Sequence, residues 1–321
     1  MSVPTFPCNE PLFIPATGSW PSSHHLFDEK SHYALRAALA ARRPLLVRGE
    51  PGTGKSQLAR AAAYHLGRLF VSEVVHARSE SQDLLWYFDA VGRLGEAQAM
   101  AAEGGAEDAK ARLNPCRYLS PGALWWVFDW ASALAQYHQC RHPQRRPQEP
   151  EGWQPVQGSV LLIDEIDKAD SDLPNGLLET LGNGAFTVPY LDRAVGLAKN
   201  IDAPLVIVTT NEERELPAAF VRRCLVLQLS VPKEEQALID WLMKRGEIHF
   251  PQCREKVRRE AARQLWEDRR EALRQGMSPP GQAEYLDILR ALQELAQDED
   301  EQIRMLDKIG EFSLKKYSQE A

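Results

Sequence analysis

The chain has 321 residues, long enough for one large and one smaller domain. With 44% hydrophobic and 26% charged residues, its composition is ordinary for a soluble globular protein and selects no special class. Its formal net charge of -7 argues against a surface built to neutralise the phosphates of nucleic acid. The five cysteines are widely spread without a Cys-x-x-Cys pair, and neither a secretory leader nor a membrane span is recognisable, which predicts a cytoplasmic protein without metal-binding or disulfide-forming cysteines.

The first part of the chain leads into a glycine-rich loop. Residues 1–26 contain several prolines and few periodic apolar positions, which predicts an irregular N-terminal arm. Apolar residues and alanines then recur at helical spacing over 27–43, and the apolar run that follows predicts a buried strand over 44–48.

Residues 49–56 read Gly-Glu-Pro-Gly-Thr-Gly-Lys-Ser and match the phosphate-binding pattern Gly-x-x-x-x-Gly-Lys-[Ser/Thr] at every fixed position. Gly52 and Gly54 allow the backbone N–H groups to point into one concavity, Lys55 is suited to the β- and γ-phosphates, and Ser56 is suited to Mg²⁺. A glycine turn that binds nothing is the alternative, and the strand before the loop and the helix after it disfavour that interpretation. The residues expected to contact a nucleotide are Gly49, Glu50, Pro51, Gly52, Thr53, Gly54, Lys55, Ser56 and Gln57.

The next part of the chain is longer than a simple strand–helix repeat requires. A second core strand is predicted over 69–75, and the next acidic strand end lies far beyond it, which indicates inserts at about residues 80–155. Helical patterns occupy 82–102 and 123–137, and the second contains Trp125, Trp126 and Trp130. Core packing under an inserted helix is the favoured interpretation of these tryptophans, and a docking surface for a partner is the alternative.

Two later strands end in polar residues suited to phosphate chemistry. The apolar run 160–163 delivers Asp164 and Glu165 to the carboxyl end of a buried strand, where ligands of parallel sheets bind. Asp164 is suited to the Mg²⁺ shell and Glu165 to the water that attacks a γ-phosphate, whereas an acidic pair that caps the next helix is the alternative. The run 204–210 is followed by Asn211, placed to hold the attacking water or the γ-phosphate.

The remaining elements are predicted as follows. A helix over 172–182 precedes a β-hairpin over 186–198, and a short helix over 215–224 ends in Arg222 and Arg223. These arginines complement the helix dipole or, pointed across a subunit boundary, act on the transferred phosphate. A fifth strand is expected over 225–229, and helices over 234–245, 254–275, 284–297 and 301–317.

In this order, the phosphate loop, the Asp164–Glu165 strand, the strand before Asn211, the arginine-ended helix and the helical C-terminal part resemble the AAA+ ATPases. The wording Leu-Leu-Ile-Asp-Glu-Ile-Asp-Lys-Ala at 161–169 resembles the MoxR-like branch more narrowly. So do the helix with Leu177 and Leu178 followed by Phe-Thr-Val, and Glu-Leu-Pro-Ala-Ala-Phe-Val-Arg-Arg-Cys at 215–224.

The resemblance implies an α/β fold: a P-loop AAA+ core of five parallel strands flanked by helices over 27–232, followed by a small all-helical lid over 233–321. It implies ATP and Mg²⁺ bound between core and lid, and a homo-oligomeric ring, usually a hexamer. Asn211 falls on the position called sensor 1, and Arg222 with Arg223 on the arginine-finger position. The segments 82–88 and 186–198 resemble inserts that face the ring's pore. The lid arginine expected near 280–283 is missing, and Pro280 or Gln282 stands in its place.

These features predict an ATPase that converts ATP and water to ADP and phosphate and remodels or chaperones a partner protein. MoxR-like proteins often work with proteins carrying a von Willebrand factor A domain, which is the partner the resemblance implies. A nucleic-acid motor subunit of the restriction or defence type and a nucleotide-gated scaffold with little hydrolysis are the alternatives. The sequence has no Asn-Lys-x-Asp guanine signature, which favours ATP over GTP.

Overall fold

The computed structural model describes residues 3–103, 109–191 and 193–313. The chain divides into two compact units. The first comprises the described residues of Met1–Cys8, Asp28–Val47 and Leu58–Leu227, and the second those of Asn9–Phe27, Arg48–Gln57 and Gln228–Ala321. None of the helices in the described part of the chain has the length and apolar character needed to cross a membrane.

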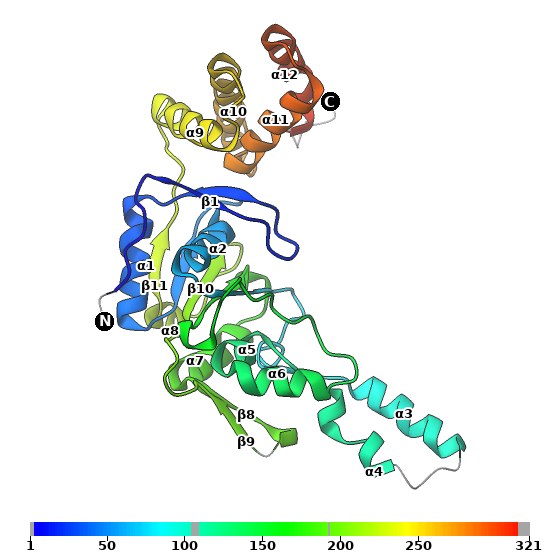
Figure 1. Ribbon diagram of the computed structural model, residues 1–321. Coiled ribbons are helices and arrows are strands. Elements are labelled where there is room, and N and C mark those ends of the chain that lie inside the picture. The colour runs from blue at the N-terminus through cyan, green and yellow to red at the C-terminus, as the bar shows by residue number, and fades with distance from the viewer. Residues whose placement is uncertain (1–2, 104–108, 192, 314–321) are drawn as a thin grey trace. The chain divides into compact units, whose positions relative to one another are not determined.

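A five-stranded parallel sheet flanked by helices forms the centre of the α/β fold, as predicted (Figure 1). Its central strands are buried on both faces; in β7 the residues from Val160 to Ile163 are fully buried. Such strands need apolar side chains at every position, which explains the uninterrupted apolar runs in the sequence. The strands, in spatial order, are β11 (Leu225–Gln228), β3 (Leu45–Arg48), β10 (Leu205–Thr210), β7 (Ser159–Asp164) and β4 (Leu69–Val74).

Four helices lie close to the predicted positions. They are α1 (Glu29–Ala41), α2 (Lys55–Leu66), α7 (Asp172–Asn183) and α8 (Ala218–Arg223). The side chain of Asp28 accepts a hydrogen bond from the Ser31 N–H at 2.7 Å, which caps the start of α1. The predicted hairpin is confirmed: β8 (Ala185–Val188) pairs antiparallel with β9 (Arg193–Gly196).

The inserted segment differs from its prediction in two places. The start of the helix predicted over 82–102 is instead β5 (Trp86–Phe88), which pairs with β6 (Leu119–Pro121); α3 (Ala90–Glu103) and α4 (Ala109–Arg112) follow β5. Tertiary pairing of an aromatic tripeptide therefore overrides the local helical spacing. The helix predicted over 123–137 is two helices, α5 (Ala123–Phe128) and α6 (Trp130–Gln139), because Asp129 leaves helical geometry and caps α6.

The tryptophans of this segment belong to the core of the first unit. Trp125 is completely buried, and Trp126 and Trp130 are 4% and 7% exposed. The Trp126 and Trp130 ring centroids lie 4.8 Å apart, and Trp125 packs at 6.2 Å from Phe186 of β8. Core packing is therefore confirmed, and the alternative of a tryptophan docking surface is wrong.

The N-terminal stretch is more regular than expected. In the second unit, β1 (Pro11–Ile14) pairs antiparallel with β2 (Ser23–Leu26). Each strand has four residues, and Ile14 is the only fully buried residue among these eight. So short and half-exposed a pattern gives no periodic signal, which explains why an irregular arm was predicted.

The rest of the second unit contains four helices close to the predicted positions. Its core includes Leu238, Leu242, Val257, Leu265, Tyr285, Ile288, Leu292 and Leu306. Gly246 lets helices approach closely, because a Cβ there would lie 2.6 Å from the Tyr285 hydroxyl. The helices are α9 (Glu235–His249), α10 (Glu255–Arg274), α11 (Gln282–Leu295) and α12 (Glu299–Ser313). The predicted positions 314–317 lie outside the described residues.

Candidate functional site

The glycine-rich loop begins directly after β3, and α2 starts at Lys55. Gly49, Gly52 and Gly54 have φ angles of +154°, +74° and +88°, a range that L-residues with a Cβ rarely adopt. A Cβ on Gly49 would in addition lie 2.6 Å from the carbonyl oxygen of Leu229. The backbone conformation at these positions therefore requires glycine.

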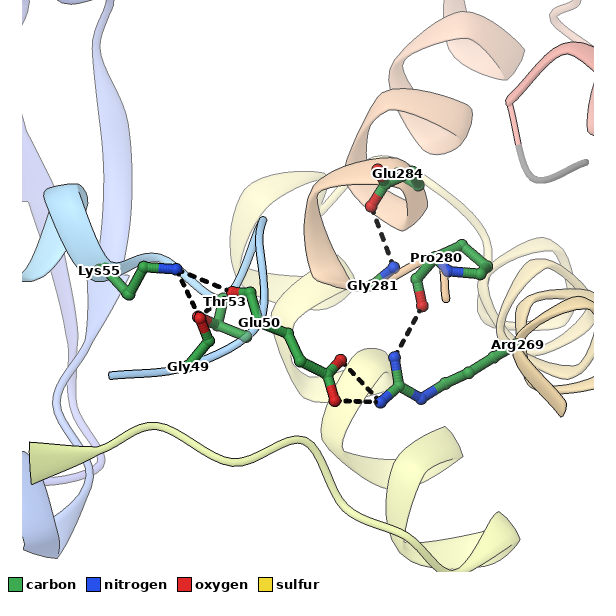
Figure 2. A network of polar contacts seen from close by, with 8 residues as sticks. All are labelled: Gly49, Glu50, Thr53, Lys55, Arg269, Pro280, Gly281 and Glu284. Atoms are coloured by element: carbon green, nitrogen blue, oxygen red, sulfur yellow. Dashed lines mark hydrogen bonds and ion pairs between the residues drawn. The ribbon is translucent and has the colours of Figure 1, made fainter. Parts of the chain in front are cut away.

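Lys55 is held inside the loop (Figure 2). It is 7% exposed, and its Nζ donates hydrogen bonds to the carbonyl oxygens of Gly49, at 2.7 Å, and Glu50, at 3.0 Å. The Thr53 hydroxyl donates to the same Glu50 carbonyl at 2.8 Å. Two carbonyl oxygens of the loop therefore hold the Lys55 ammonium group, whose positive charge suits the phosphates of a nucleotide.

The other residues of the loop contact the β1–β2 hairpin and α11 or begin α2. Ser56 is the second residue of α2, and the Gln57 amide donates to the Ser23 hydroxyl of the β1–β2 hairpin. Gly52 packs near α11, since a Cβ there would lie 3.0 Å from that of Ala283. Pro51 also lies near the start of α11, because a Cβ on Gly281 would be 3.7 Å from the Pro51 carbonyl oxygen.

The carboxylate of Glu50 is paired with Arg269 of α10, a partner that sequence reasoning did not identify (Figure 2). One guanidinium nitrogen, Nη2, donates to both Glu50 oxygens at 2.8 and 2.7 Å. The other, Nη1, donates to the Pro280 carbonyl at 3.0 Å. Pro280 and Gln282 flank the N-cap of α11, and the Gln282 side chain accepts a hydrogen bond from Arg245 at 2.7 Å.

At the carboxyl end of β7, Asp164 is fixed by the neighbouring strand β10. Val208 lies opposite Ile163 in the parallel register, so Thr209 reaches the level of Asp164. The buried Thr209 hydroxyl donates to Asp164 Oδ1 at 2.5 Å and accepts the Glu165 N–H at 2.9 Å. One threonine thus orients both acidic residues.

Glu165 has a left-handed backbone conformation, with φ 59° and ψ 47°. Such a conformation is uncommon for a residue with a side chain and is concentrated at functional sites. Its carboxylate accepts hydrogen bonds from Lys168 Nζ at 2.6 Å and Asn211 Nδ2 at 3.2 Å. Its hydrogen bond and charge raise the pKa of Lys168.

The alternative that the acidic pair caps the next helix does not fit this geometry. Glu165 occupies the N-cap position of the short 3-10 turn Ile166–Lys168, yet its side chain makes no capping hydrogen bond to the described residues of that turn. The structure instead brings Glu165 together with Asp164 and Asn211, as the sequence suggested. Thr209 and Lys168 complete the cluster and were not predicted.

Within the described residues, no three His, Cys, Asp or Glu side chains cluster as a metal cage. A magnesium ion that binds together with substrate phosphates and water commonly takes only one or two protein oxygens and needs no such cage.

Arg222 and Arg223 lie at the exposed end of α8. Arg43 caps that end, donating to the carbonyl oxygens of Arg222 at 2.5 Å, Arg223 at 3.0 Å and Cys224 at 3.2 Å. In the part of the chain that the structure describes, neither guanidinium forms an ion pair with a carboxylate. The backbone of this helix end is thus fixed while two cationic side chains face outward.

The profile of the AAA domain (dynein-related subfamily) matches residues 44–224, more than half of the chain. The chain belongs to this AAA family. The match covers the loop at Gly49–Ser56, the acidic strand end, Asn211 and the α8 arginines. Membership makes the chain an AAA+ ATPase by family, with the nucleotide-binding P-loop core that the sequence predicted.

No curated protein matches the chain. Among solved structures, a presumed ATPase from Cytophaga hutchinsonii aligns at 13% identity and a TM-score of 0.37, over 86% of this chain and 78% of that one. A point mutant of Thermotoga maritima RuvB aligns at 15% identity and a TM-score of 0.40, over 88% and 75% of the two chains. Similarities this low carry no information about function.

Proposed function

We propose that this AAA protein binds ATP with Mg²⁺ and hydrolyses it to ADP and phosphate. The observation that carries the proposal is the Glu165 carboxylate, held in a left-handed backbone conformation between Lys168 and Asn211 beside Asp164. A carboxylate on a left-handed residue, with two donors fixing its orientation, is better suited to positioning a water than to stabilising the fold.

Each residue has a role in the proposed reaction. The backbone of the loop from Gly49 to Gln57 and the Lys55 ammonium bind the phosphates, and Ser56 and Asp164 would hold the magnesium ion. Bound magnesium ATP supplies the electrophilic γ-phosphoryl group. Glu165 orients the attacking water and accepts its proton, and Asn211 fixes the position of Glu165. Arg222 and Arg223 act on the phosphate held by a neighbouring copy.

The proposed site is therefore shared between subunits. Two exposed arginines at a capped helix end support this arrangement, since an arginine supplied in trans can raise the rate by about 10³ to 10⁵. We place the protein, on the wording of its motifs, in the MoxR-like branch, forming a homo-oligomeric ring, as a hexamer, in the cytoplasm. There it would remodel a client, with a von Willebrand factor A domain protein as the implied partner.

The test separates binding from chemistry. Glu165→Gln keeps the size and hydrogen-bonding capacity of the side chain but removes the base. We expect phosphate release to fall by roughly 10² or more, in the range that general bases contribute, while the affinity for ATP is kept. Hydrolysis at the parent rate by this variant would show that Glu165 is not the base. Absence of ATP binding by the parent would refute the proposed function altogether.

A further inference from the structure

We infer that Arg269 supplies the positive charge that lets the phosphate loop, which contains the acidic residue Glu50, accept a polyphosphate. The inference rests on the proposed function and names a positioning residue for it. Glu50 places a negatively charged carboxylate within a motif that binds negatively charged phosphates.

Glu50 lies close to the group expected to meet the phosphates. Its own carbonyl oxygen is 3.0 Å from Lys55 Nζ, and its carboxylate stands on the same residue. Coulomb repulsion between that carboxylate and the negative charges of a nucleotide's phosphates would weaken binding. Glu50 therefore needs a nearby counter-charge.

Arg269 meets this need in a fixed geometry (Figure 2). Its side chain is 7% exposed, and Nη2 contacts both oxygens of Glu50, whose side chain is 42% exposed. The second nitrogen is tied to the Pro280 carbonyl, which orients the guanidinium plane. An arginine guanidinium keeps its charge where a lysine or histidine could lose it, so this counter-charge is permanent.

The pair also makes the loop sensitive to the helical part of its unit. Arg269 comes from α10, and Pro280 lies in the connection to α11, 219 and 230 positions from Glu50 in the sequence (269 − 50 and 280 − 50). The family resemblance expects an arginine near residues 280–283, at the start of α11. The arginine that contacts the loop, Arg269, instead comes from α10. This arginine acts through Glu50, with no contact to the nucleotide required.

Two roles for the pair predict opposite signs for one substitution. If Arg269 only holds the loop in its conformation, Glu50→Gln weakens nucleotide binding, because the charged hydrogen bond between Arg269 and residue 50 becomes a weaker one to a neutral acceptor. If Arg269 neutralises Glu50, the same substitution leaves a net positive charge beside the phosphates and keeps or tightens binding. Gln is the matched replacement, since it retains an acceptor for Arg269.

The experiment is calorimetric titration of the full chain, with Mg²⁺ present, by a slowly hydrolysed ATP analogue and by ADP. We expect Arg269→Met to raise the dissociation constant for the analogue by about threefold to tenfold, because the Glu50 side chain is 42% exposed and its charge is partly screened, and that for ADP by less. Glu50→Gln is expected to keep or lower the constant. The double variant should return to within about twofold of the parent, the usual error of such cycles.

Arg274→Met is the control. Arg274 also lies on α10 and pairs with a glutamate, Glu271, but its side chain is 64% exposed. The Arg274→Met substitution removes the same charge as Arg269→Met at a position away from the loop. The affinities of this variant for the ATP analogue and for ADP should equal those of the parent. Melting temperatures establish that each variant is folded. If Arg269→Met does not fold, the direction in which Glu50→Gln changes the affinity for the ATP analogue decides between the two roles.

The outcomes separate the two claims. Parent binding that is unchanged by Arg269→Met, or weakened by Glu50→Gln, overturns the inference and leaves the proposed function standing. A parent chain that binds neither nucleotide overturns the proposed function, and this inference with it. Loss of affinity in Arg269→Met that Glu50→Gln reverses supports the inference.

Discussion

Glu165 combines three features that separately would mean little: a left-handed backbone, an ammonium partner and an amide partner. Left-handed geometry in a glutamate costs energy, and the fold maintains it through the hydrogen bond from the Glu165 N–H to Thr209. The side chains of Thr209, Asn211 and Lys168 fix the acidic end of β7, and two of them, Lys168 and Thr209, each support a distinct expectation.

Lys168 should hold the Glu165 carboxylate in its position. Its Nζ donates a hydrogen bond to that carboxylate at 2.6 Å. Lys168→Met removes this donor, so the carboxylate is less well oriented toward the attacking water. We expect kcat for ATP hydrolysis to fall by about tenfold, the effect of losing one charged hydrogen bond, with a smaller change in the affinity for ATP. Lys199→Met, which changes an exposed lysine of the same unit, serves as the control, and equal kcat values for both variants would contradict this role.

Thr209 should act on the same carboxylates through hydrogen bonding alone. Thr209→Val keeps the shape but removes the donor to Asp164 and the acceptor for the Glu165 N–H. Leaving a buried backbone N–H unsatisfied costs about 1–3 kcal/mol, and here it also releases the geometry of Glu165. We expect lower kcat with a smaller change in the binding of ATP, measured by phosphate release and titration. Thr209→Ser should retain most of the rate, and a valine variant equal to the parent would refute the role.

At the scale of the elements, the break between α5 and α6 depends on Asp129. Its Oδ1 accepts the Ser132 N–H at 3.0 Å, and the Ser132 hydroxyl accepts the Trp125 indole N–H at 2.8 Å. Asp129→Ala removes the cap and should lower the free energy of unfolding by about 1 kcal/mol, whereas Asp129→Asn should be nearly neutral because asparagine caps as well. Chemical denaturation measures the difference. Equal losses in both variants would mean that charge, not capping, is what Asp129 provides.

The junction of α9 with the β1–β2 hairpin should be acid-sensitive. Burial, together with His24, Arg245 and Arg290, lowers the pKa of His249 to about 4, and the His24 and His249 ring centroids lie 5.7 Å apart. The unfolded chain binds this proton near pH 6.5 and the folded chain only near 4. Stability is therefore present above pH 6.5 and is lost as the pH falls toward 4. His249→Phe should flatten this part of the melting-temperature profile, and an unchanged slope would assign the acid sensitivity elsewhere.

The sequence predicts those elements that depend on a local pattern of residues. The loop at Gly49–Ser56, the buried strands and the helices of the second unit have strong local patterns, and the structure has them at the predicted places. The strands β5 and β6 are three residues each and exist only through pairing with each other, which no local pattern records. The break at Asp129 was readable in principle, since an aspartate three residues before Ser132 is a capping signal.

The candidate site shows the same division. Asp164, Glu165 and Asn211 were found because they follow apolar strands directly. Thr209 becomes visible only when β10 is known to lie beside β7 in parallel register. Arg269 is separated from Glu50 by 219 positions in a helix rich in charges, where nothing distinguishes it from its neighbours until burial does.

At the scale of the whole molecule, the proposal needs more than one copy of the chain. Arg222 and Arg223 are exposed and act on a neighbour in the proposed ring. An Arg222→Ala/Arg223→Ala chain and a Glu165→Gln chain should each be nearly idle, yet their mixture should regain hydrolysis, because mixed interfaces then contain one intact site. Phosphate release at several mixing ratios measures this, with each variant alone at the same total concentration as the control. No recovery at any ratio would place the arginines outside the site.

Assembly itself should respond to nucleotide. Bound ATP is contacted by both sides of the proposed interface, so by mass action it favours the ring. Light scattering with Mg²⁺ and a slowly hydrolysed ATP analogue should then give a mass of about six subunits, the number that the family resemblance implies, and a smaller mass without nucleotide. The Arg274→Met variant should assemble like the parent. A persistent monomer with the analogue bound would contradict the ring.

The most direct test of the central claim is the rate of phosphate release per subunit, measured with saturating magnesium ATP over a wide range of protein concentrations. A site completed by a neighbour predicts a low rate per subunit in dilute solution that rises steeply and then levels off as the ring forms. A rate per subunit that is the same at every concentration while the protein is monomeric would show that one chain hydrolyses ATP alone. It would contradict the shared site.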